Sequence, residues 1–320
     1  ILRPFSPSPS DLSLVAILKH QRKMIKKILK IFSIILLLFI AFSFWMSPRL
    51  GGLLNFGKEK IGKEVLKIEF DTISTNEYQL VYEVVSENED KIKLRQEFKL
   101  DSIIKDCKTD FDKITKIQSW VQSRWKHNGE NIPEKNDAFY ILKEAEKGKQ
   151  FRCVEYSIVA QQCLQSLGFV VRGLGLMTKD INEVKSGGGH VVNEVYLSDA
   201  KKWVLIDPQY DIITIHNGKP LNAVELQYCI VNNLDFEIIN PNKTITKVEY
   251  MKWIGPYLYY FTTTLKGERI EIWDRIVGNK KQLTLYPKEA EKPKYFQNLI
   301  RINNSYYTHS INDFYPKIDK

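Results

Sequence analysis

The sequence predicts an α+β protein in which one buried helix is followed by an antiparallel sheet. Residues 153–167 are apolar on most faces, as expected of a central helix. Three apolar, β-branched runs follow it, separated by polar or Gly-rich turns. The chain has 320 residues, 43% of them hydrophobic, which suffices for one large core and a smaller module. A hydrophobic segment precedes this core near the N-terminus.

Residues 24–50 combine a basic lead, "MIKKILK", with the apolar run "IFSIILLLFIAFSFWM". This pattern is typical of a signal peptide or an N-terminal membrane anchor. The run has 16 residues, whereas a spanning helix needs about 20, so cleaved signal and retained anchor both stay open. We expect a protein that is anchored in the cell membrane and faces outside the cytoplasm, or one exported to the periplasm or the extracellular space.

Residues 1–23 precede the first methionine, Met24, and contain the Pro/Ser-rich stretch "PFSPSPSD". We expect translation to start at Met24, and residues 1–23 to be a non-native or disordered extension.

The charge distribution excludes a nucleic-acid-binding protein. The net charge is +9, but residues 1–30 hold seven Lys and Arg side chains and one acid. A nucleic-acid-binding domain concentrates positive charge on its folded part. The four cysteines, Cys107, Cys153, Cys163 and Cys229, have no C-x-x-C spacing, so we expect neither a metal site nor a cofactor.

The main domain is expected over residues 65–240. It begins with two strands, Leu66–Phe70 and Tyr78–Val85, which follow a polar spacer at 51–64. Apolar residues at three- and four-residue spacing then predict a helix over Asp110–Trp125. A short helix is predicted over 137–145.

The central helix, 153–167, precedes three strands, at 169–177, 190–197 and 202–207. A four-residue turn separates the last two, so Leu197 should pair with Lys202. Asp207 then lies opposite Val192 and shares a face with His190, whereas Asn193 points to the other face. A slip of one residue would reverse this conclusion.

Residues 245–320 are expected to form a small β-rich C-terminal module. Its predicted antiparallel strands are "VEYMKWIG", "YLYYFTTTL", "ERIEIW" and "QLTLYP", which are aromatic-rich and punctuated by Gly and Pro.

A cysteine, a histidine and an aspartate follow one another on these elements. Cys153 opens the central helix, whose free N–H groups and partial positive charge favour a thiolate. His190 begins a strand and can serve as the base that a cysteine nucleophile needs. Asp207 ends the partner strand and can orient the imidazole. The other readings are a disulfide or a zinc ligand at Cys153 and a turn cap at Asp207. Cys163, within the helix, is expected to be a buried small side chain.

The segments "FRCVEYSIVAQQCLQSLGFVVRGLGL", "GGGHVVNEVYL" and "KWVLIDPQYD" resemble the transglutaminase-like superfamily over roughly residues 105–215. The resemblance implies a papain-like core, with Cys153 as nucleophile, His190 as base and Asp207 as the orienting acid. No residue matches the family's oxyanion side chain, which leaves the backbone N–H groups, including that of Cys153, for that task.

The expected function is therefore cysteine-dependent acyl transfer on peptide or amide bonds. Hydrolysis, as in a protease or amidase, is favoured over cross-linking, because nothing resembles the calcium-binding, multi-domain layout of animal cross-linking enzymes. The expected partners are a protein or peptide substrate, cell-wall peptides included, and the membrane. The alternative is a non-catalytic envelope binding protein built on the same fold.

Overall fold

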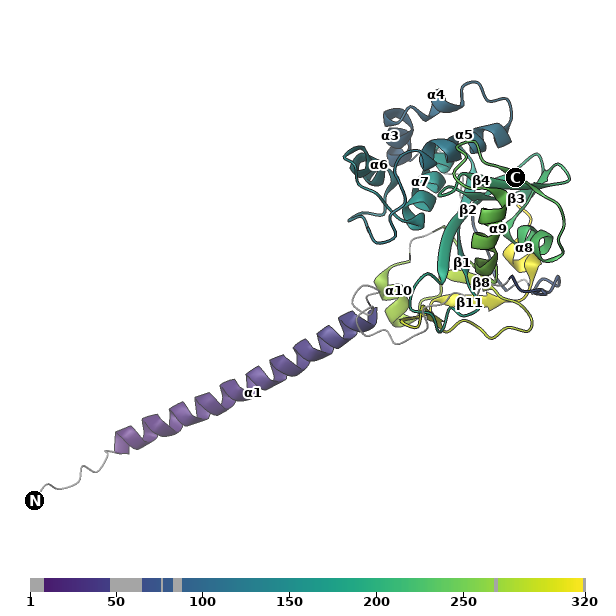
Figure 1. Ribbon diagram of the computed structural model, residues 1–320. Coiled ribbons are helices and arrows are strands. Elements are labelled where there is room, and N and C mark those ends of the chain that lie inside the picture. Colours follow the sequence, from purple (N-terminus) through teal and green to yellow (C-terminus); the bar gives the residue numbers. More distant parts are fainter. Residues whose placement is uncertain (1–8, 47–64, 76, 83–87, 268–269, 319–320) are drawn as a thin grey trace, which may run out of the picture. The chain divides into compact units, whose positions relative to one another are not determined.

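The computed structural model describes residues 9–46, 65–75, 77–82, 88–267 and 270–318 (Figure 1). The chain divides into two compact units, residues 1–56 and 57–320, and each is described by itself.

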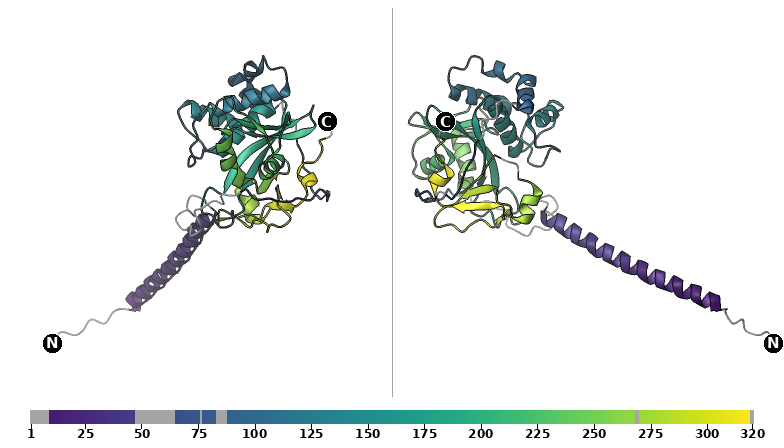
Figure 2. Two further views of the ribbon diagram at one scale, coloured as in Figure 1. Left: turned by 45° about the vertical axis from the view of Figure 1, so that its right-hand side comes forward. Right: turned by 180° about the vertical axis from the view of Figure 1, so that it is seen from behind.

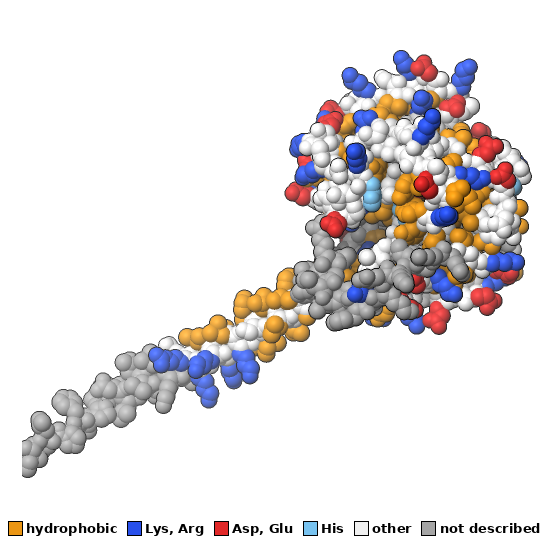
Figure 3. All heavy atoms as spheres, in the orientation of Figure 1, with side chains coloured by type: hydrophobic (Ala, Val, Ile, Leu, Met, Phe, Trp, Pro, Cys, Tyr) orange, Lys and Arg blue, Asp and Glu red, His pale blue; other side chains and the backbone are white. Residues whose placement is uncertain are grey.

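The described part of the first unit is the helix α1 (Pro9–Met46). This helix begins within the segment 1–23, whose assignment as a non-native or disordered extension stays a prediction. Residues 1–8 and the spacer 51–64 lie outside the described residues. Figure 3 shows the basic side chains of α1 preceding its apolar ones, and the apolar side chains of residues 24–42 are largely exposed. Over the described part of the chain, no helix combines the length and apolarity that a membrane crossing requires. The expected anchor is thus not confirmed.

The second unit is built on a mixed sheet, which confirms the predicted α+β class. Its strands run in the order β11-β8-β7-β1-β2-β3-β4-β5, with β6 paired to β4. Neighbouring strands are antiparallel except β8 and β11, which are parallel. The bounds are β1 (Val170–Met177), β2 (Gly189–Leu197), β3 (Lys202–Asp207), β4 (Ile212–His216), β5 (Lys219–Pro220), β6 (Glu237–Ile239), β7 (Tyr260–Thr264), β8 (Gln282–Leu285) and β11 (Ser305–Thr308).

A helical layer covers one face of β1–β4 (Figures 1 and 2). Its members are α3 (Glu89–Glu97), α4 (Leu100–Ile104), α5 (Asp110–Gln122), α6 (Ala138–Glu146) and α7 (Cys153–Ser166). The predicted helices correspond to α5, α6 and α7, whereas α3 and α4 were not predicted. At the N-terminus of α5, Thr109 and Asp112 form a reciprocal capping box. Buried apolar side chains of α5, α6 and α7 pack on Val171, Val195 and Val204 of the sheet.

The opposite face is covered by segments from the C-terminal part of the chain. They include α8 (Ala223–Val231), α9 (Lys247–Ile254), the 3₁₀ turn η2 (Gly255–Tyr257) and α11 (Ile311–Phe314). Their apolar side chains pack with Leu174, Leu176 and Val192 in a second core cluster. Helices pack on both faces of the sheet, so β1–β4 divide the core into two layers.

The expectation of a separate C-terminal β module is corrected in two ways. First, β7 pairs with β1 through Gly175 and Thr262, so β7, β8 and β11 continue the main sheet. Among the described residues only β9 (Tyr295–Phe296) and β10 (Ile300–Arg301) pair apart from it. Second, "VEYMKWIG" lies mainly in α9, and the described part of "ERIEIW" leads into a helix, α10 (Ile272–Val277).

The strands predicted at 66–70 and 78–85 are not found among the described residues, and residues 83–87 lie outside them. These segments instead run alongside the C-terminal part of the chain. The amide of Asp71 donates to the carbonyl of His309 at 2.7 Å, and that of Val81 donates to Leu265 at 2.8 Å.

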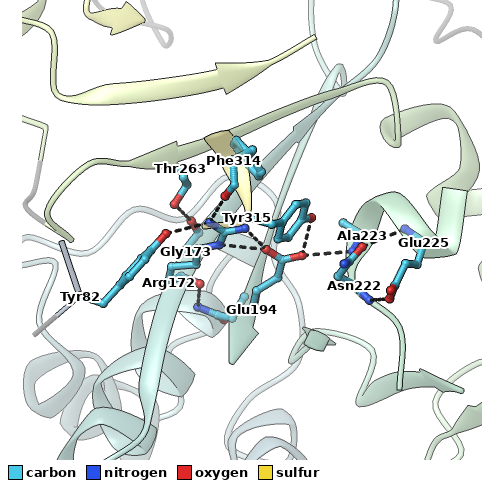
Figure 4. Close-up of polar contacts among 11 residues, drawn as sticks. Tyr82, Arg172, Gly173, Glu194, Asn222, Ala223, Glu225, Thr263, Phe314 and Tyr315 are labelled. Carbon is cyan, nitrogen blue, oxygen red and sulfur yellow. Dashed lines mark hydrogen bonds and ion pairs between the residues drawn. The ribbon is translucent and has the colours of Figure 1, made fainter. Parts of the chain in front are cut away.

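A buried ion pair ties these outer segments to the sheet (Figure 4). Arg172 of β1 donates from Nε and Nη2 to Oε2 of Glu194 on β2, at 2.9 and 2.6 Å. Its Nη1 donates to the Tyr82 hydroxyl at 2.9 Å and to the Phe314 carbonyl at 2.8 Å. The other carboxylate oxygen of Glu194 accepts from the Tyr315 hydroxyl at 2.8 Å. Arg172 thus joins β1 and β2 to one segment that precedes α3, through Tyr82, and to another that follows β11, through Phe314.

Candidate active site

Cys153 is the first residue of α7, as predicted, and its side chain is half-buried. The Glu155 carboxylate accepts from the backbone N–H of Arg152 at 3.0 Å and from the Arg152 guanidinium at 2.7 Å. Glu155 is fully buried, so this pairing balances a negative charge that would otherwise oppose a thiolate two residues away. The N-terminus of α7 therefore stays favourable to an anion.

His190 and Asp207 lie side by side on the sheet. The register is the predicted one, because Leu197 pairs with Lys202 and Asn193 with Ile206. The two side chains consequently share the face opposite α7, and His190 Nε2 lies 3.0 Å from Asp207 Oδ2. His190 is 2% exposed and Asp207 is 0% exposed, so water does not screen their interaction.

Cys153 and His190 lie close enough for each to shift the pKa of the other. Because Nε2 faces Asp207, Nδ1 is the ring nitrogen left for the thiol. Burial raises the pKa of Cys153, but the hydrogen bonds and charge of His190, together with the backbone of Val191, bring it below its ordinary value. Burial lowers the pKa of His190, but Asp207 and Cys153 raise it to about 9. Each group thus favours the ionised form of the other.

Further hydrogen bonds fix the Asp207 carboxylate. Oδ1 accepts from the backbone N–H of Gln209 at 3.1 Å and, more weakly, from that of Tyr210 at 3.4 Å. Oδ2, which faces His190, also accepts from the Tyr250 hydroxyl at 3.2 Å. Burial and the nearby Asp207 charge raise the pKa of Tyr250 well above its ordinary value, so this phenol remains a donor.

Aromatic side chains from α9 and η2 cover the imidazole. The ring of Trp253 lies edge-to-face with His190, with centroids 4.5 Å apart, and Tyr257 lies 5.9 Å away. Tyr210 packs on Trp253 at 4.5 Å. Sequence analysis missed this cover because it placed residues 247–257 in a separate β module. The available signals were the sequence "TKVE", which forms a capping box, and the helical spacing of Tyr250, Trp253 and Tyr257.

Three other residues, Trp125, His127 and Cys163, have different surroundings. Trp125 is buried and packs against Tyr156, with ring centroids 4.4 Å apart. His127 is exposed on the surface. The pKa of His127 is lowered, first by partial loss of hydration and second by the charge of the nearby His190. Cys163 is fully buried, and burial raises the pKa of its thiol.

The composition of the site defines its chemistry. All four cysteines are free thiols, and the described residues contain no cluster of three His, Cys, Asp or Glu side chains arranged to hold a metal ion. What the structure brings together is a thiol of lowered pKa, an imidazole of raised pKa and a buried carboxylate.

Comparison with protein families gives a match over the part of the chain that carries this site. The model of the transglutaminase-like superfamily matches residues 99–208, from the end of α3 to the residue after Asp207. Residues 99–208 are thus similar to a transglutaminase-like domain. Nine chains of solved structures also match. One is a putative cysteine protease from Cytophaga hutchinsonii, 14% identical, with a TM-score of 0.31; the match covers 43% of this chain and 48%, about half, of that one. No curated protein matches.

The matched range includes Cys153, His190 and Asp207 but not all of the residues that contact them. Tyr210, and the α9 and η2 residues that contact His190 and Asp207, lie after residue 208. The site is therefore completed by residues beyond the matched range.

Proposed function

We propose that the transglutaminase-like domain is a cysteine-dependent acyl-transfer enzyme that acts on peptide or amide bonds. Cys153 is the nucleophile, His190 the base and Asp207 the group that orients His190. The carrying observation is the buried pair of His190 and Asp207, 3.0 Å apart, together with Cys153 at the start of α7, close enough that His190 helps to lower its pKa. The position of the cysteine on α7, packed against an antiparallel sheet that carries the other two residues, supports a papain-like arrangement of the core.

The chemistry would take place in two steps. The thiolate attacks the substrate carbonyl, the carbon–nitrogen bond breaks, and the imidazolium of His190 protonates the departing amine. Neutral His190 then takes a proton from water, which attacks the thioester and releases the acid and the Cys153 thiol. Backbone N–H groups at the start of α7, including that of Cys153, would stabilise the oxyanion in both steps.

We further propose hydrolysis of a protein or peptide as the reaction, with cell-wall peptides included in the substrate class. Water is the acceptor because the sequence has none of the calcium-binding, multi-domain layout of animal cross-linking enzymes. The charge distribution, in which basic residues concentrate in residues 1–30, favours a substrate other than nucleic acid.

Selective alkylation tests the proposal. The full chain would be treated with iodoacetamide at pH 7, and the modification rate of each cysteine followed by peptide mass spectrometry. Cys153 should react at least about tenfold faster than Cys163, because reactivity follows the thiolate fraction and access. His190→Ala should remove most of that advantage.

Trapping on a peptide mixture tests catalysis itself. The intact protein should acquire a thioacyl adduct on Cys153, and Cys153→Ala should acquire none, whereas Cys163→Ala should behave as the parent. The enzyme proposal fails if Cys153 reacts no faster than Cys163 and no adduct forms, an outcome that would leave a binding protein on this fold.

The location of the protein is a separate proposal. The basic lead and the exposed apolar side chains of α1 support export or membrane attachment through residues 24–46. Cell fractionation should find the full chain in the membrane or exported fraction. A chain without residues 24–46 should stay in the cytosol; equal distribution of both would overturn this proposal.

A further inference from the structure

A cavity of about 560 Å³ lies between α7 and the strands β1 and β7. Its lining includes Val154 and Val191, which directly follow Cys153 and His190 in the chain. One end of the cavity therefore lies at the first turn of α7, which Cys153 begins.

Two glycines keep the floor of this cavity open. Gly173 and Gly175 alternate along β1 on the face that α7 covers, and both line the cavity. A Cβ atom at Gly173 would lie 3.4 Å from Gln161 Oε1, and one at Gly175 would lie 3.7 Å from the Thr262 carbonyl. Neither glycine has the positive φ that only glycine adopts readily, so the backbone does not require glycine there. Glycine within a strand weakens the strand and marks close approach of another group, which fits a floor kept clear for a ligand.

The wall formed by α7 is polar but uncharged near Cys153. The residues that line it lie three or four positions apart on one helix face: Val154, Ser157, Ile158, Gln161 and Gln165. Ser157 donates to the Val192 carbonyl at 3.1 Å, and Gln165 donates to that of Val171 at 3.3 Å. By contrast, the Gln161 amide has no hydrogen-bond partner among the residues that the structure describes, and it is free to bind a ligand.

The charged residues of the lining lie toward the other end. They are Asp90, Lys91 and Asp137. Asp137 caps the N-terminus of α6. The backbone N–H of Ala138, the next residue, donates to Gln162 Oε1 at 3.0 Å. Gln162 follows Cys153 by nine positions, or roughly 13 Å along a helix at 1.5 Å per residue. An extended peptide would place about four residues in the uncharged part, at roughly 3.3 Å each.

We propose that this cavity binds about four uncharged residues of the peptide substrate, next to the bond attacked by Cys153. Small or amide side chains fit it, because the floor is bare backbone and the free group in the wall is the Gln161 amide. A carboxylate or ammonium group in the uncharged part would lose its hydration without an opposite charge beside it. The position of the scissile bond beside Cys153 rests on the proposed function. The binding of a peptide in the cavity does not depend on that function.

Peptide binding to the full chain with Cys153→Ala tests the cavity without catalysis. The probes are acetyl-Gly-Ser-Gln-Gly-Ser-Gly-amide and two analogues with Glu or Lys in place of Gln, titrated by calorimetry or by NMR. The neutral peptide should bind, and each charged analogue should bind at least about tenfold more weakly.

Variants that fill the floor give the second arm. Gly175→Ala and Gly175→Val, in the Cys153→Ala background, should weaken binding of the neutral peptide by about tenfold or more, and Gln161→Leu by severalfold. Leu174→Val is the matched control, because Leu174 lies on the opposite face of the same strand and is fully buried in the other core layer. Thermal unfolding verifies that each variant is folded, and the alanine variant serves if the valine variant is not.

Three results would overturn the proposal: no binding of the neutral peptide, equal binding of a charged analogue, or unchanged binding to the folded Gly175 variants. Failure of the proposed function would look different. In that case Cys153 in the parent chain would be no more reactive than Cys163, while peptide binding and its loss in the Gly175 variants would stand.

Discussion

Replacement of Arg172 by methionine should destabilise the protein strongly. The guanidinium is 2% exposed and lies over the rings of Trp203, Phe314 and Tyr315, at 4.4, 4.7 and 4.7 Å from their centroids. It is also the cationic partner of the fully buried Glu194. Arg172→Met preserves a side chain of similar length but removes both the charge and the donors (Figure 4).

The dominant cost is the carboxylate left behind. Breaking a buried ion pair by removing one partner costs about 3–5 kcal/mol. In a protein of this size each kcal/mol lowers the melting temperature by about 2–4 °C. Arg172→Met should therefore lower the free energy of unfolding by about 3–5 kcal/mol and the melting temperature by about 6–20 °C. Urea unfolding followed by tryptophan fluorescence, and calorimetry, measure these quantities.

A second variant separates the charge from the packing. In Arg172→Met/Glu194→Gln, the amide oxygen can still accept from the Ala223 N–H and the Tyr315 hydroxyl, as Glu194 Oε1 does, and no unpaired charge remains. The double variant should be more stable than Arg172→Met alone by at least about 1 kcal/mol. If Arg172→Met unfolds within about 1 kcal/mol of the parent, or if the double variant is the less stable of the two, the reasoning is wrong.

Three further predictions concern the site. With rising pH, kcat/KM should first increase as the Cys153 thiol ionises, at a pH below the ordinary pKa of a cysteine. It should then fall near pH 9, where His190 loses its proton. A profile still rising above pH 10 would contradict a thiolate–imidazolium pair of Cys153 and His190. Tyr250→Phe should lower kcat by about tenfold with little change in KM, because Asp207 loses one donor, whereas Tyr259→Phe serves as the control. A chain that ends at Thr244 should be far more sensitive to proteolysis than the full chain and lose selective alkylation of Cys153; retention of both properties would show that the C-terminal part is dispensable.

The proposed triad could be placed from the sequence because it lies on elements with strong local signals. A four-residue turn fixed the pairing of Leu197 with Lys202, and the two-residue period of strands then put His190 and Asp207 on one face. The N-terminus of α7 was equally clear, since an apolar helix begins where a polar, Gly-bearing turn ends. These inferences needed only local geometry.

The segment 247–257 was misassigned because composition and periodicity disagreed. Tyr, Trp and Val favour strands, and these residues are frequent there. The helix is instead set by the cap at Thr246 and by burial of Tyr250 and Ile254 against the sheet. Burial against a distant surface is a tertiary effect that overrides local propensity.

The joining of the C-terminal strands to β1 had no local signal at all. Strand runs predict that a sheet exists, but not which edge each strand meets. Here β1 bonds to β2 on one side and to β7 on the other, and the two are separated in sequence by more than 60 residues. The sequence therefore predicted the strands β7 and β8 while giving the wrong sheet for them.

This topology explains why the surroundings of the site come from so far along the chain. His190 and Asp207 project from the sheet face opposite α7, so α7 itself cannot shield them from water. The chain that follows β4 must therefore return across that face, and α9 does so with Tyr250 bonded to Asp207 and Trp253 packed on His190. The low polarity that results strengthens the interaction between imidazole and carboxylate. The proposed nucleophile thus depends on local helix geometry, whereas the proposed base depends on packing supplied by residues after the matched range.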